Sequence, residues 1–220
     1  KLLPRLDSGF GCCGSPKEIE DARRVCERLG VPHYVLDMHE LFAKTVIEPF
    51  IDNYRRAKTP NPCVECNRHL KFGMLLAKAR LLGCSHVATG HYARLVEQEG
   101  HLTLRRGADE AKAQSYFLWP LPVDGRSRIL FPLAEMDKPR VRALAERRGL
   151  PTARRNESQD VCFIPASTAA FLETQGVAAA PGDIVHENGE TVGRHLGIHR
   201  YTLGQRKGLG IAWPGPLYVK

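Results

Sequence analysis

The spacing of apolar residues at the start of the chain predicts a helix followed by a strand. Residues 15–18 (SPKE) have the form of a helix capping box with proline in the first turn, and Gly30 is typical of a helix end. Residues 32–38 (PHYVLDM) form a short apolar run, which predicts a buried strand. The helix between the two helix-end signals has one apolar face, made of Ile19, Ala22, Cys26 and Leu29.

Two more helices and a second strand follow. Residues 68–82 predict a helix, and residues 85–89 (SHVAT) predict a strand that runs into the tripeptide 90–92 (GHY). The order of elements implies an α/β fold with a mainly parallel sheet, in which ligands bind beyond the carboxyl ends of the strands. Residues 90–92 are therefore a candidate binding segment, although a plain strand exit would have the same sequence. The helix before these, over residues 39–56, has an inward face made of Leu41, Phe42, Val46, Phe50 and Tyr54.

The pattern changes in the second half of the chain. Residues 94–106 predict a β-hairpin, residues 111–121 a short helix, and residues 137–149 a longer helix. From about residue 166, short β segments follow, including a hairpin over residues 183–194 with an Asn-Gly turn. We therefore expect two domains, an α/β domain over residues 1–165 and the start of a small β-rich domain over residues 166–220.

The amino-acid composition limits which binding partners and which cellular compartment we expect for the protein. The 220 residues carry a net charge of +8, which suits a polyanion such as nucleic acid, although an unspecialised basic surface explains the charge equally well. The longest apolar run is far below the ~20 residues that a membrane helix needs, so we expect no membrane partner. Seven cysteines, an odd number, without an export signal in the sequence, favour a reducing cytoplasm.

The stretch TPNPCVECNRHLKFG, residues 59–73, holds a C-x-x-C pair, Cys63 and Cys66, in a polar turn ahead of the third helix. Such a pair is half of a typical zinc site, but no second pair is present to complete four ligands. An iron–sulfur cluster remains possible, because Cys63, Cys66 and the distant Cys162 could supply three thiolates. Of the two metal sites considered, only the iron–sulfur cluster thus has a candidate set of ligands in the sequence.

A reactive thiol is the third interpretation of this stretch. Cys66 precedes a helix that bears Arg68, His69 and Lys71, and both these charges and the helix N-terminus would lower a thiol pKa. Cys162 lies in a polar run after two arginines, where no hydrophobic pattern predicts a buried cysteine. By contrast, Cys26 and Cys84 fit ordinary buried positions. Residues 7–11 (DSGFG) resemble a phosphate loop only superficially, because no apolar strand precedes them.

Six strings give the sequence a wider resemblance. TPNPCVECN, KFG, ATGHYARL, QSYFL, ESQDVCFIP and YTLGQRKGLGI occur in the order and approximate spacing of the bacterial tRNA-specific 2-thiouridylases. The similarity covers nearly the whole chain. It implies a parallel-sheet domain of the adenine-nucleotide alpha-hydrolase type (a PP-loop ATPase), followed by the start of a β-rich central domain that binds tRNA.

The resemblance also implies an activity. In this family, ATP with Mg²⁺ adenylates the C2 oxygen of the wobble uridine in tRNAs for lysine, glutamate and glutamine. A cysteine persulfide, loaded by a sulfur-carrier protein, then delivers sulfur to C2. By motif position, Cys162 corresponds to the persulfide cysteine and Cys66 to the nucleophile, and the two can form a disulfide. The resemblance further implies target-base contacts at Asn61, Pro62 and Cys63, an ATP contact at Gly90, and tRNA contacts at Lys112, Ala113 and Gln114.

The sequence departs from the family at three points. The family's opening strand and SGGxDS phosphate loop have no counterpart here. We therefore expect an N-terminally incomplete sheet, and we expect that these 220 residues by themselves cannot bind or use ATP productively. Ala113 stands where the family usually has aspartate. Cys63 stands where some relatives have aspartate, which supports an alternative [4Fe-4S] cluster held by Cys63, Cys66 and Cys162.

Two other functions compete with tRNA thiolation. One is a tRNA-binding remnant without catalysis, which the missing phosphate loop favours. The other is a different ATP-using sulfur transferase or amidating enzyme with the same nucleotide fold. The string YTLGQRKGLGI argues against the latter, because it resembles the β domain of the thiouridylases.

Overall fold

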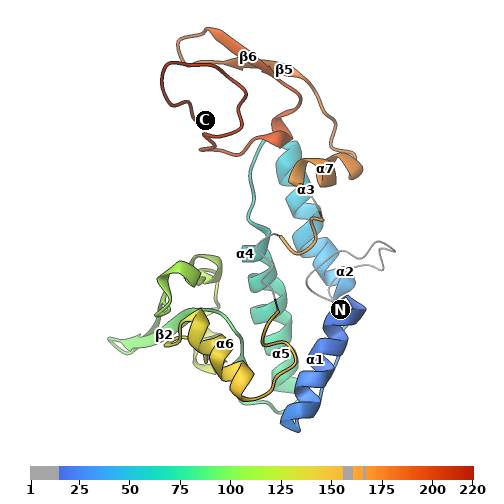
Figure 1. The fold of residues 1–220 in the computed structure, drawn as a ribbon, viewed down its shortest axis with the longest axis vertical. Coiled ribbons are helices and arrows are strands. Elements are labelled where there is room, and N and C mark those ends of the chain that lie inside the picture. The colour runs from blue at the N-terminus through green and yellow to red at the C-terminus, as the bar shows by residue number, and fades with distance from the viewer. Residues whose placement is uncertain (1–14, 156–160, 166) are drawn as a thin grey trace. The chain divides into compact units, whose positions relative to one another are not determined.

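The computed structural model describes residues 15–155, 161–165 and 167–220. The chain folds into two compact units, which interleave along the sequence (Figure 1). The first unit comprises residues 1–46 and 62–163, and the second comprises residues 47–61 and 164–220. Each unit has its own buried residues, and each is described separately.

The first helix, α1 (Pro16–Leu29), confirms the predicted helix ends. The Ser15 hydroxyl accepts from the Glu18 backbone N–H, and the Glu18 carboxylate accepts from the Ser15 N–H, each at 3.3 Å. Gly30 ends the helix in the left-handed region, at φ 67°. No α1 residue is fully buried, so the predicted apolar face is only partly covered.

The predicted strand over residues 32–38 is wrong. These residues have no regular secondary structure, and the side chains of Tyr34 and Val35 are 78% and 52% exposed. A strand exists only when a neighbour pairs with its backbone groups, and no segment in the described ranges pairs with this one. An apolar run alone therefore did not determine its conformation.

The predicted helix over residues 39–56 is confirmed, with an unexpected middle. It consists of α2 (His39–Phe42), a π-helical segment η1 (Ala43–Ile47) and α3 (Glu48–Arg55). Four of its buried residues recur every four positions, at Phe42, Val46, Phe50 and Tyr54, and Ile51 is also buried. A wider π turn keeps a spacing of four on one face better than the 3.6-residue α turn does.

The strands of the first unit form two small sheets. Strand β1 (Val87–Ala88) pairs in parallel with β4 (Ile129–Leu130), and β2 (Ala93–Gln98) pairs antiparallel with β3 (His101–Arg106). The second pair confirms the predicted hairpin. The main core joins both sheets to the helix after the cysteines, through Phe72, Ala93, Leu118, Leu121, Ile129 and Phe131.

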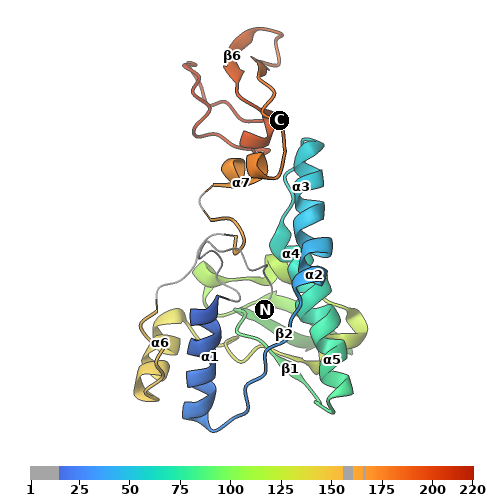
Figure 2. The same ribbon diagram turned by 90° about the vertical axis from the view of Figure 1, so that its right-hand side faces the viewer.

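Helices cover this sheet region. Helix α5 (Leu75–Leu81) packs beside β1, where Leu76 and Ala79 meet Val87 (Figure 2). Helix α6 (Lys138–Arg147) confirms the helix predicted over residues 137–149, with the Asp137 carboxylate accepting from the Arg140 N–H at 2.8 Å. Three 3-10 turns connect these elements, η3 (Glu110–Lys112), η4 (Ser115–Leu118) and η5 (Val123–Arg128). A parallel strand pair with flanking helices agrees with the predicted α/β class.

The second unit contains α3, α7 (Thr168–Thr174), the short turn η6 (Ile198–Arg200) and a hairpin. The hairpin strands β5 (Gly182–Val185) and β6 (Thr191–His195) pair antiparallel, and Gly189 in their turn has φ 90°. This confirms the predicted Asn-Gly hairpin. Helix α3 packs on α7, with the rings of Phe50 and Phe171 6.4 Å apart.

Candidate functional site

The C-x-x-C pair lies within a helix rather than in a turn ahead of one, which corrects the sequence interpretation. Helix α4 (Pro62–Cys66) continues into the π-helical segment η2 (Asn67–Met74) and then into α5. Proline is well tolerated in a first helical turn, so Pro62 begins the helix instead of preventing it. The positive end of the helix therefore lies nearer Cys63, which is exposed, than Cys66, which is half-buried.

The glycine of the KFG motif has a structural explanation in this π segment. A Cβ atom on Gly73 would lie 2.8 Å from the backbone oxygen of Arg68, five residues earlier. That distance is too short for a real contact, and the opposing atom is backbone. The π turn therefore requires glycine at position 73.

The positive side chains after Cys66 are partly neutralised within the helix. The Glu65 carboxylate lies 3.6 Å from the Arg68 guanidinium and 3.2 Å from the His69 ring nitrogen. Lys71 points elsewhere, with its Nζ atom 3.5 Å from the Nε2 atom of His91. The cysteine thus has fewer uncompensated charges beside it than the sequence indicates.

His91 is the buried polar centre of the GHY segment. It is 8% exposed, and its Nδ1 atom lies 2.7 Å from the Thr89 hydroxyl. Burial, together with the nearby Lys71 charge, lowers the pKa of His91 to about 4. The imidazole is therefore neutral near pH 7, and Nε2 accepts a hydrogen bond from the Lys71 ammonium. This pairing joins the GHY segment to the KFG motif, and no local pattern in the sequence predicts it.

Gly90 follows β1, at the carboxyl end where the fold predicts a ligand. A Cβ atom at this position would meet only Leu133 Cδ1, at an ordinary 3.7 Å. Packing among the described residues therefore does not explain the glycine, which leaves room for close approach of a ligand. Residues 7–11, which superficially resemble a phosphate loop, lie outside the described residues.

The predicted tRNA-contacting segment, residues 112–114, lies beside the GHY segment. The side-chain oxygen of Gln114 accepts from the Tyr92 backbone N–H at 3.1 Å, and the Gln114 N–H donates to the Tyr92 carbonyl at 3.0 Å. Lys112 ends a 3-10 turn that the Asp109 carboxylate caps at 3.1 Å. Gln114 therefore holds the strand exit in place as well as belonging to the QSYFL motif, a role that no local pattern predicts.

The cysteine helix is also joined to the QSYFL motif. Asn67, directly after Cys66, is 2% exposed, and its amide nitrogen donates to the Phe117 carbonyl at 2.9 Å. Its side-chain oxygen has no hydrogen-bond partner among the residues that the structure describes. Asn67 is not among the predicted site residues, because an asparagine in a polar helix start gives no indication of burial.

Cys162 belongs to the same unit as Cys66 and is half-buried. The next residue, Phe163, packs edge-on against Phe42 with the ring centroids 5.7 Å apart. The two arginines upstream have carboxylate partners: Arg154 lies 3.1 Å from Glu146, and Arg155 lies 2.6 Å from Glu18. They are therefore not a dedicated positive environment for this thiol.

The remaining predicted site residues differ in exposure. Pro62 is buried and Asn61 is half-buried, whereas Cys63 faces solvent. Across residues 15–155, 161–165 and 167–220 the structure has no disulfide. Nor does it bring three His, Cys, Asp or Glu side chains together as a metal site within those ranges. Cys63, Cys66 and Cys162 thus do not form a ready three-thiolate cluster site.

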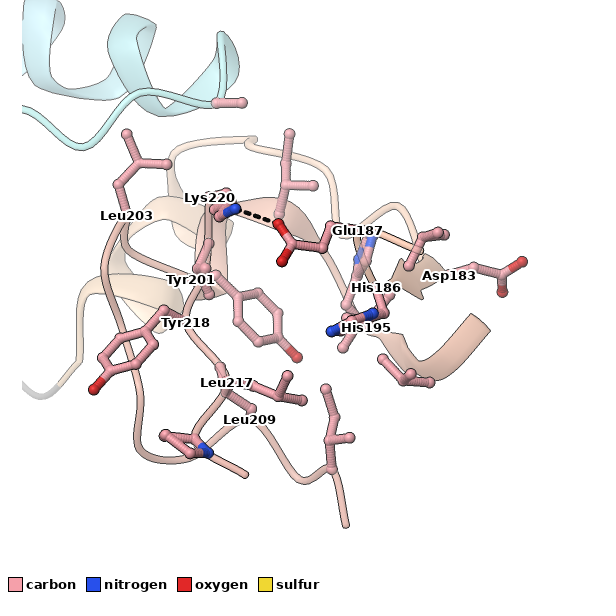
Figure 3. Close-up of a pocket in the computed structure, with 18 of the residues that line it drawn as sticks. Asp183, His186, Glu187, His195, Tyr201, Leu203, Leu209, Leu217, Tyr218 and Lys220 are labelled. Atoms are coloured by element: carbon pink, nitrogen blue, oxygen red, sulfur yellow. Dashed lines mark hydrogen bonds and ion pairs between the residues drawn. The ribbon is translucent and has the colours of Figure 1, made fainter. Parts of the chain in front are cut away.

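A cavity of about 580 Å³ lies in the second unit. Figure 3 shows Tyr201, His195 and Leu217 turned toward one another, and an ion pair between Lys220 and Glu187 at one side. The lining is mostly aliphatic and includes no cysteine. None of the predicted site residues lines it.

Comparison with known proteins shows which protein-family models the chain matches. Residues 4–166 match the model of the tRNA methyl transferase HUP domain, and residues 169–220 match that of the tRNA methyl transferase PRC-barrel domain. These matches define an α/β HUP domain followed by a PRC-barrel domain. No helix in the described part of the chain is long and apolar enough to cross a bilayer.

Several curated relatives carry the name tRNA-specific 2-thiouridylase MnmA. The protein from Leptospira biflexa is 46% identical over 98% of this chain and 57% of its own length. Proteins from Syntrophus aciditrophicus and Trichlorobacter lovleyi are 50% and 52% identical over 94% and 90% of the chain. The chain therefore belongs to the tRNA-specific 2-thiouridylase family. It spans slightly more than half the length of these relatives, 56–57%.

Proposed function

We propose that this chain belongs to an enzyme that transfers persulfide sulfur to C2 of the wobble uridine in tRNAs for lysine, glutamate and glutamine, with ATP and Mg²⁺. The observation that carries the proposal is the state of two cysteines. Cys66 and Cys162 lie in one compact unit, and both are half-buried instead of packed in hydrocarbon. Reactive thiols need such partial exposure. A basic chain of net charge +8 suits a tRNA substrate in the cytoplasm.

The proposed chemistry balances with these two thiols. The uridine C2 oxygen attacks the α-phosphorus of ATP and releases pyrophosphate, which makes AMP the leaving group. The terminal sulfur of a Cys162 persulfide bonds to C2, and the C2–O bond to AMP breaks. The Cys66 thiolate attacks the Cys162 sulfur, so that the persulfide S–S bond breaks and a Cys66–Cys162 disulfide forms. A dithiol reductant then restores both thiols, and a sulfur-carrier protein reloads Cys162.

The other predicted residues have roles that fit their positions. Gly90, at the exit of β1, leaves space for the nucleotide to approach the backbone. Asn61, Pro62 and Cys63 would contact the target base, because an enzyme acting on a loop base must hold that base out of its stack. Lys112, Ala113 and Gln114 would contact the tRNA from the segment beside GHY.

Mass spectrometry of the cysteines tests the relay without the ATP step. The chain is treated with a persulfide donor, alkylated and digested. We expect a persulfide on Cys162 and, on release of sulfur, a disulfide linking Cys162 to Cys66. Cys162→Ser should abolish both products, and Cys84→Ser, an exposed cysteine elsewhere in the same unit, should change neither. A persulfide that forms equally well in Cys162→Ser would contradict the assignment.

Thiolation itself is tested with the protein expressed from its complete gene. The reaction contains ATP, Mg²⁺, a persulfide donor and an unmodified tRNA for glutamate, and nucleoside mass spectrometry detects 2-thiouridine. Cys66→Ser and Cys162→Ser should each lose the product. A salt-sensitive tRNA complex that never yields 2-thiouridine would instead support the catalytically inactive tRNA-binding alternative.

An iron–sulfur mechanism is the second candidate, because the exposed Cys63 lies in the same helix as Cys66. In that mechanism, a [4Fe-4S] cluster bound by Cys63, Cys66 and Cys162 would leave one iron open for the transferred sulfide. The donor set fits poorly, because these thiols are not gathered in the described structure. Anaerobic purification with an iron assay decides: a colourless, iron-free enzyme that thiolates tRNA would exclude the cluster.

A further inference from the structure

An exposed aromatic surface lies beside the cysteine helix, on the η4 segment. Trp119 is 60% exposed and Tyr116 is 71% exposed, whereas Leu118 between them is fully buried. Leu118 therefore anchors the segment in the core, and the two large rings are left outside it. Rings of this size are usually at least half covered in a folded protein, so their exposure calls for a partner.

The surface includes a cation from the cysteine helix. The Arg68 guanidinium carbon lies 5.1 Å from the centre of the Trp119 ring, which is a cation–π contact. Tyr116 contacts the next ring along the segment, Phe117, edge-on at 5.5 Å. Arg68, Tyr116 and Trp119 are called the stacking surface below.

The stacking surface is held in place relative to Cys66. The Asn67 side chain donates to the Phe117 carbonyl, so it joins the residue after Cys66 to the middle of the η4 segment. Buried Leu118 supplies the second attachment. A partner that binds here loses little entropy to ordering the protein side.

Aromatic rings combined with arginine fit an unstacked nucleobase best. Single-stranded loops of RNA are recognised by stacking their bases on aromatic rings and on guanidinium planes. The net charge of +8 suits the accompanying phosphates. Trp, Tyr and Arg also recur at protein interfaces, so it is the net charge of +8 that favours RNA over a protein partner here.

We infer that the stacking surface of Arg68, Tyr116 and Trp119 binds a nucleotide that neighbours the target uridine in the tRNA loop. This rests on the proposed function. Cys66 and Arg68 are two positions apart on a helix, so they project from different faces. The stacking surface therefore fits a flanking base and not the base that receives sulfur. Its role is to hold the loop open while the target base reaches the thiols.

The test uses the 220-residue chain and a hairpin RNA with the anticodon loop of a tRNA for glutamate. One loop base beside the target uridine is replaced by 2-aminopurine, whose fluorescence falls when it stacks. Trp213→Phe serves as the background, because Trp213 is the other tryptophan and lies in the second unit, stacked on His186. The remaining tryptophan emission then reports on position 119.

We expect RNA binding to quench both Trp119 and 2-aminopurine. Trp119→Ala should weaken binding at least about fivefold, the lower end of the range for one base–aromatic stack. Trp119→Phe should recover most of the affinity. The slope of log Kd against log salt should not change in Trp119→Ala, because no charge is removed. Tyr34→Ala removes another exposed ring from the same unit and should leave binding unchanged.

Three outcomes are separable. Quenching with weaker binding of Trp119→Ala and recovery by Trp119→Phe supports the stacking surface. Unchanged affinity in Trp119→Ala with unquenched 2-aminopurine overturns it and leaves the proposed function intact. A chain that does not bind the hairpin RNA at all counts against both, because the tRNA substrate itself would then be in error.

Discussion

At the scale of single residues, the buried neutral histidine is the most informative group. His91 is enclosed by the rings of Phe72 and Phe131, at 5.9 and 6.1 Å, and by the Lys71 ammonium. Both the apolar surroundings and the cation oppose protonation. The histidine therefore acts as a hydrogen-bond acceptor that places Lys71, and it does not supply positive charge to a nucleic acid near pH 7.

This burial makes stability depend on pH in a defined window. The unfolded chain binds a proton at His91 below about pH 6.5, whereas the folded chain does so only below about pH 4. The contribution of the neutral His91 to the free energy of unfolding is thus fully present above about pH 6.5 and is lost as the pH falls toward about 4. We expect the free energy of unfolding to fall by about 2 kcal/mol more in the native protein than in His91→Gln between pH 7 and pH 5.

Urea denaturation of both proteins at the two pH values measures this difference. The carboxylates and the other histidines are the same in both proteins. The difference between the two pH profiles therefore gives the contribution of His91 alone. Parallel pH profiles would show that His91 is protonated as readily in the fold as in the unfolded chain.

At the scale of elements, local sequence rules succeeded where their partners are local. The capping box of α1, the two hairpins and helix α6 followed from spacing and turn residues within a few positions. The prediction of a strand over residues 32–38 was wrong because a strand forms only when a distant segment pairs with its backbone. The helix start at Pro62 was missed because a Pro-Asn-Pro run also fits a turn. The π segment η2 was not predicted, since apolar spacing does not separate π from α turns over eight residues.

The π segment reverses the usual effect of replacing glycine in a helix. Alanine is normally better than glycine in a helix interior by about 1 kcal/mol. At position 73 the added methyl group would lie 2.8 Å from the Arg68 carbonyl oxygen, so the backbone must shift. We expect Gly73→Ala to destabilise the chain by about 1–3 kcal/mol, as overpacking does, measured by urea denaturation.

Gly90→Ala is the matched control for this substitution. Its methyl group would meet only Leu133 at 3.7 Å, so stability should be nearly unchanged. If Gly73→Ala proved as stable as the native chain, residues 67–74 would have to relax to an ordinary α-helix at no cost.

The candidate site shows the same limit of sequence reasoning. The motifs indicated Cys66, Cys162, Gly90 and the segment 112–114 through their resemblance to a family. The hydrogen bonds from Asn67 to Phe117 and from Gln114 to Tyr92 were not predictable, because they join residues 50 and 22 positions apart. Tertiary contacts of this kind leave no periodic pattern in the sequence.

At the scale of the whole molecule, the two units have separate cores, and the chain passes between them within one helical run. The first core is built around Phe72 and Leu118, and the second around Phe50, Tyr54 and Leu172. Because each unit has buried residues of its own, damage to one core should remain largely local. Stability is then not a single number for the chain.

Substitution of one core residue in each unit tests this independence. Phe50→Ala leaves a cavity between α3 and α7 and should destabilise the second unit by about 3–5 kcal/mol. Hydrogen exchange should accelerate in β5 and β6 and stay slow in β1 and β4. Phe72→Ala should give the opposite pattern. Faster exchange throughout the chain in both variants would mean that the units unfold together.

The π geometry between Asn67 and Met74 also has a consequence for the direction of the Cys66 thiol. Each α-helical residue turns the chain by about 100°. A change of this stretch to α pitch without a change of length would therefore rotate everything before it about the helix axis, while Leu76 and Ala79 stay packed on β1. The direction of the Cys66 sulfur is therefore set by helical phase, which the π pitch of residues 67–74 determines.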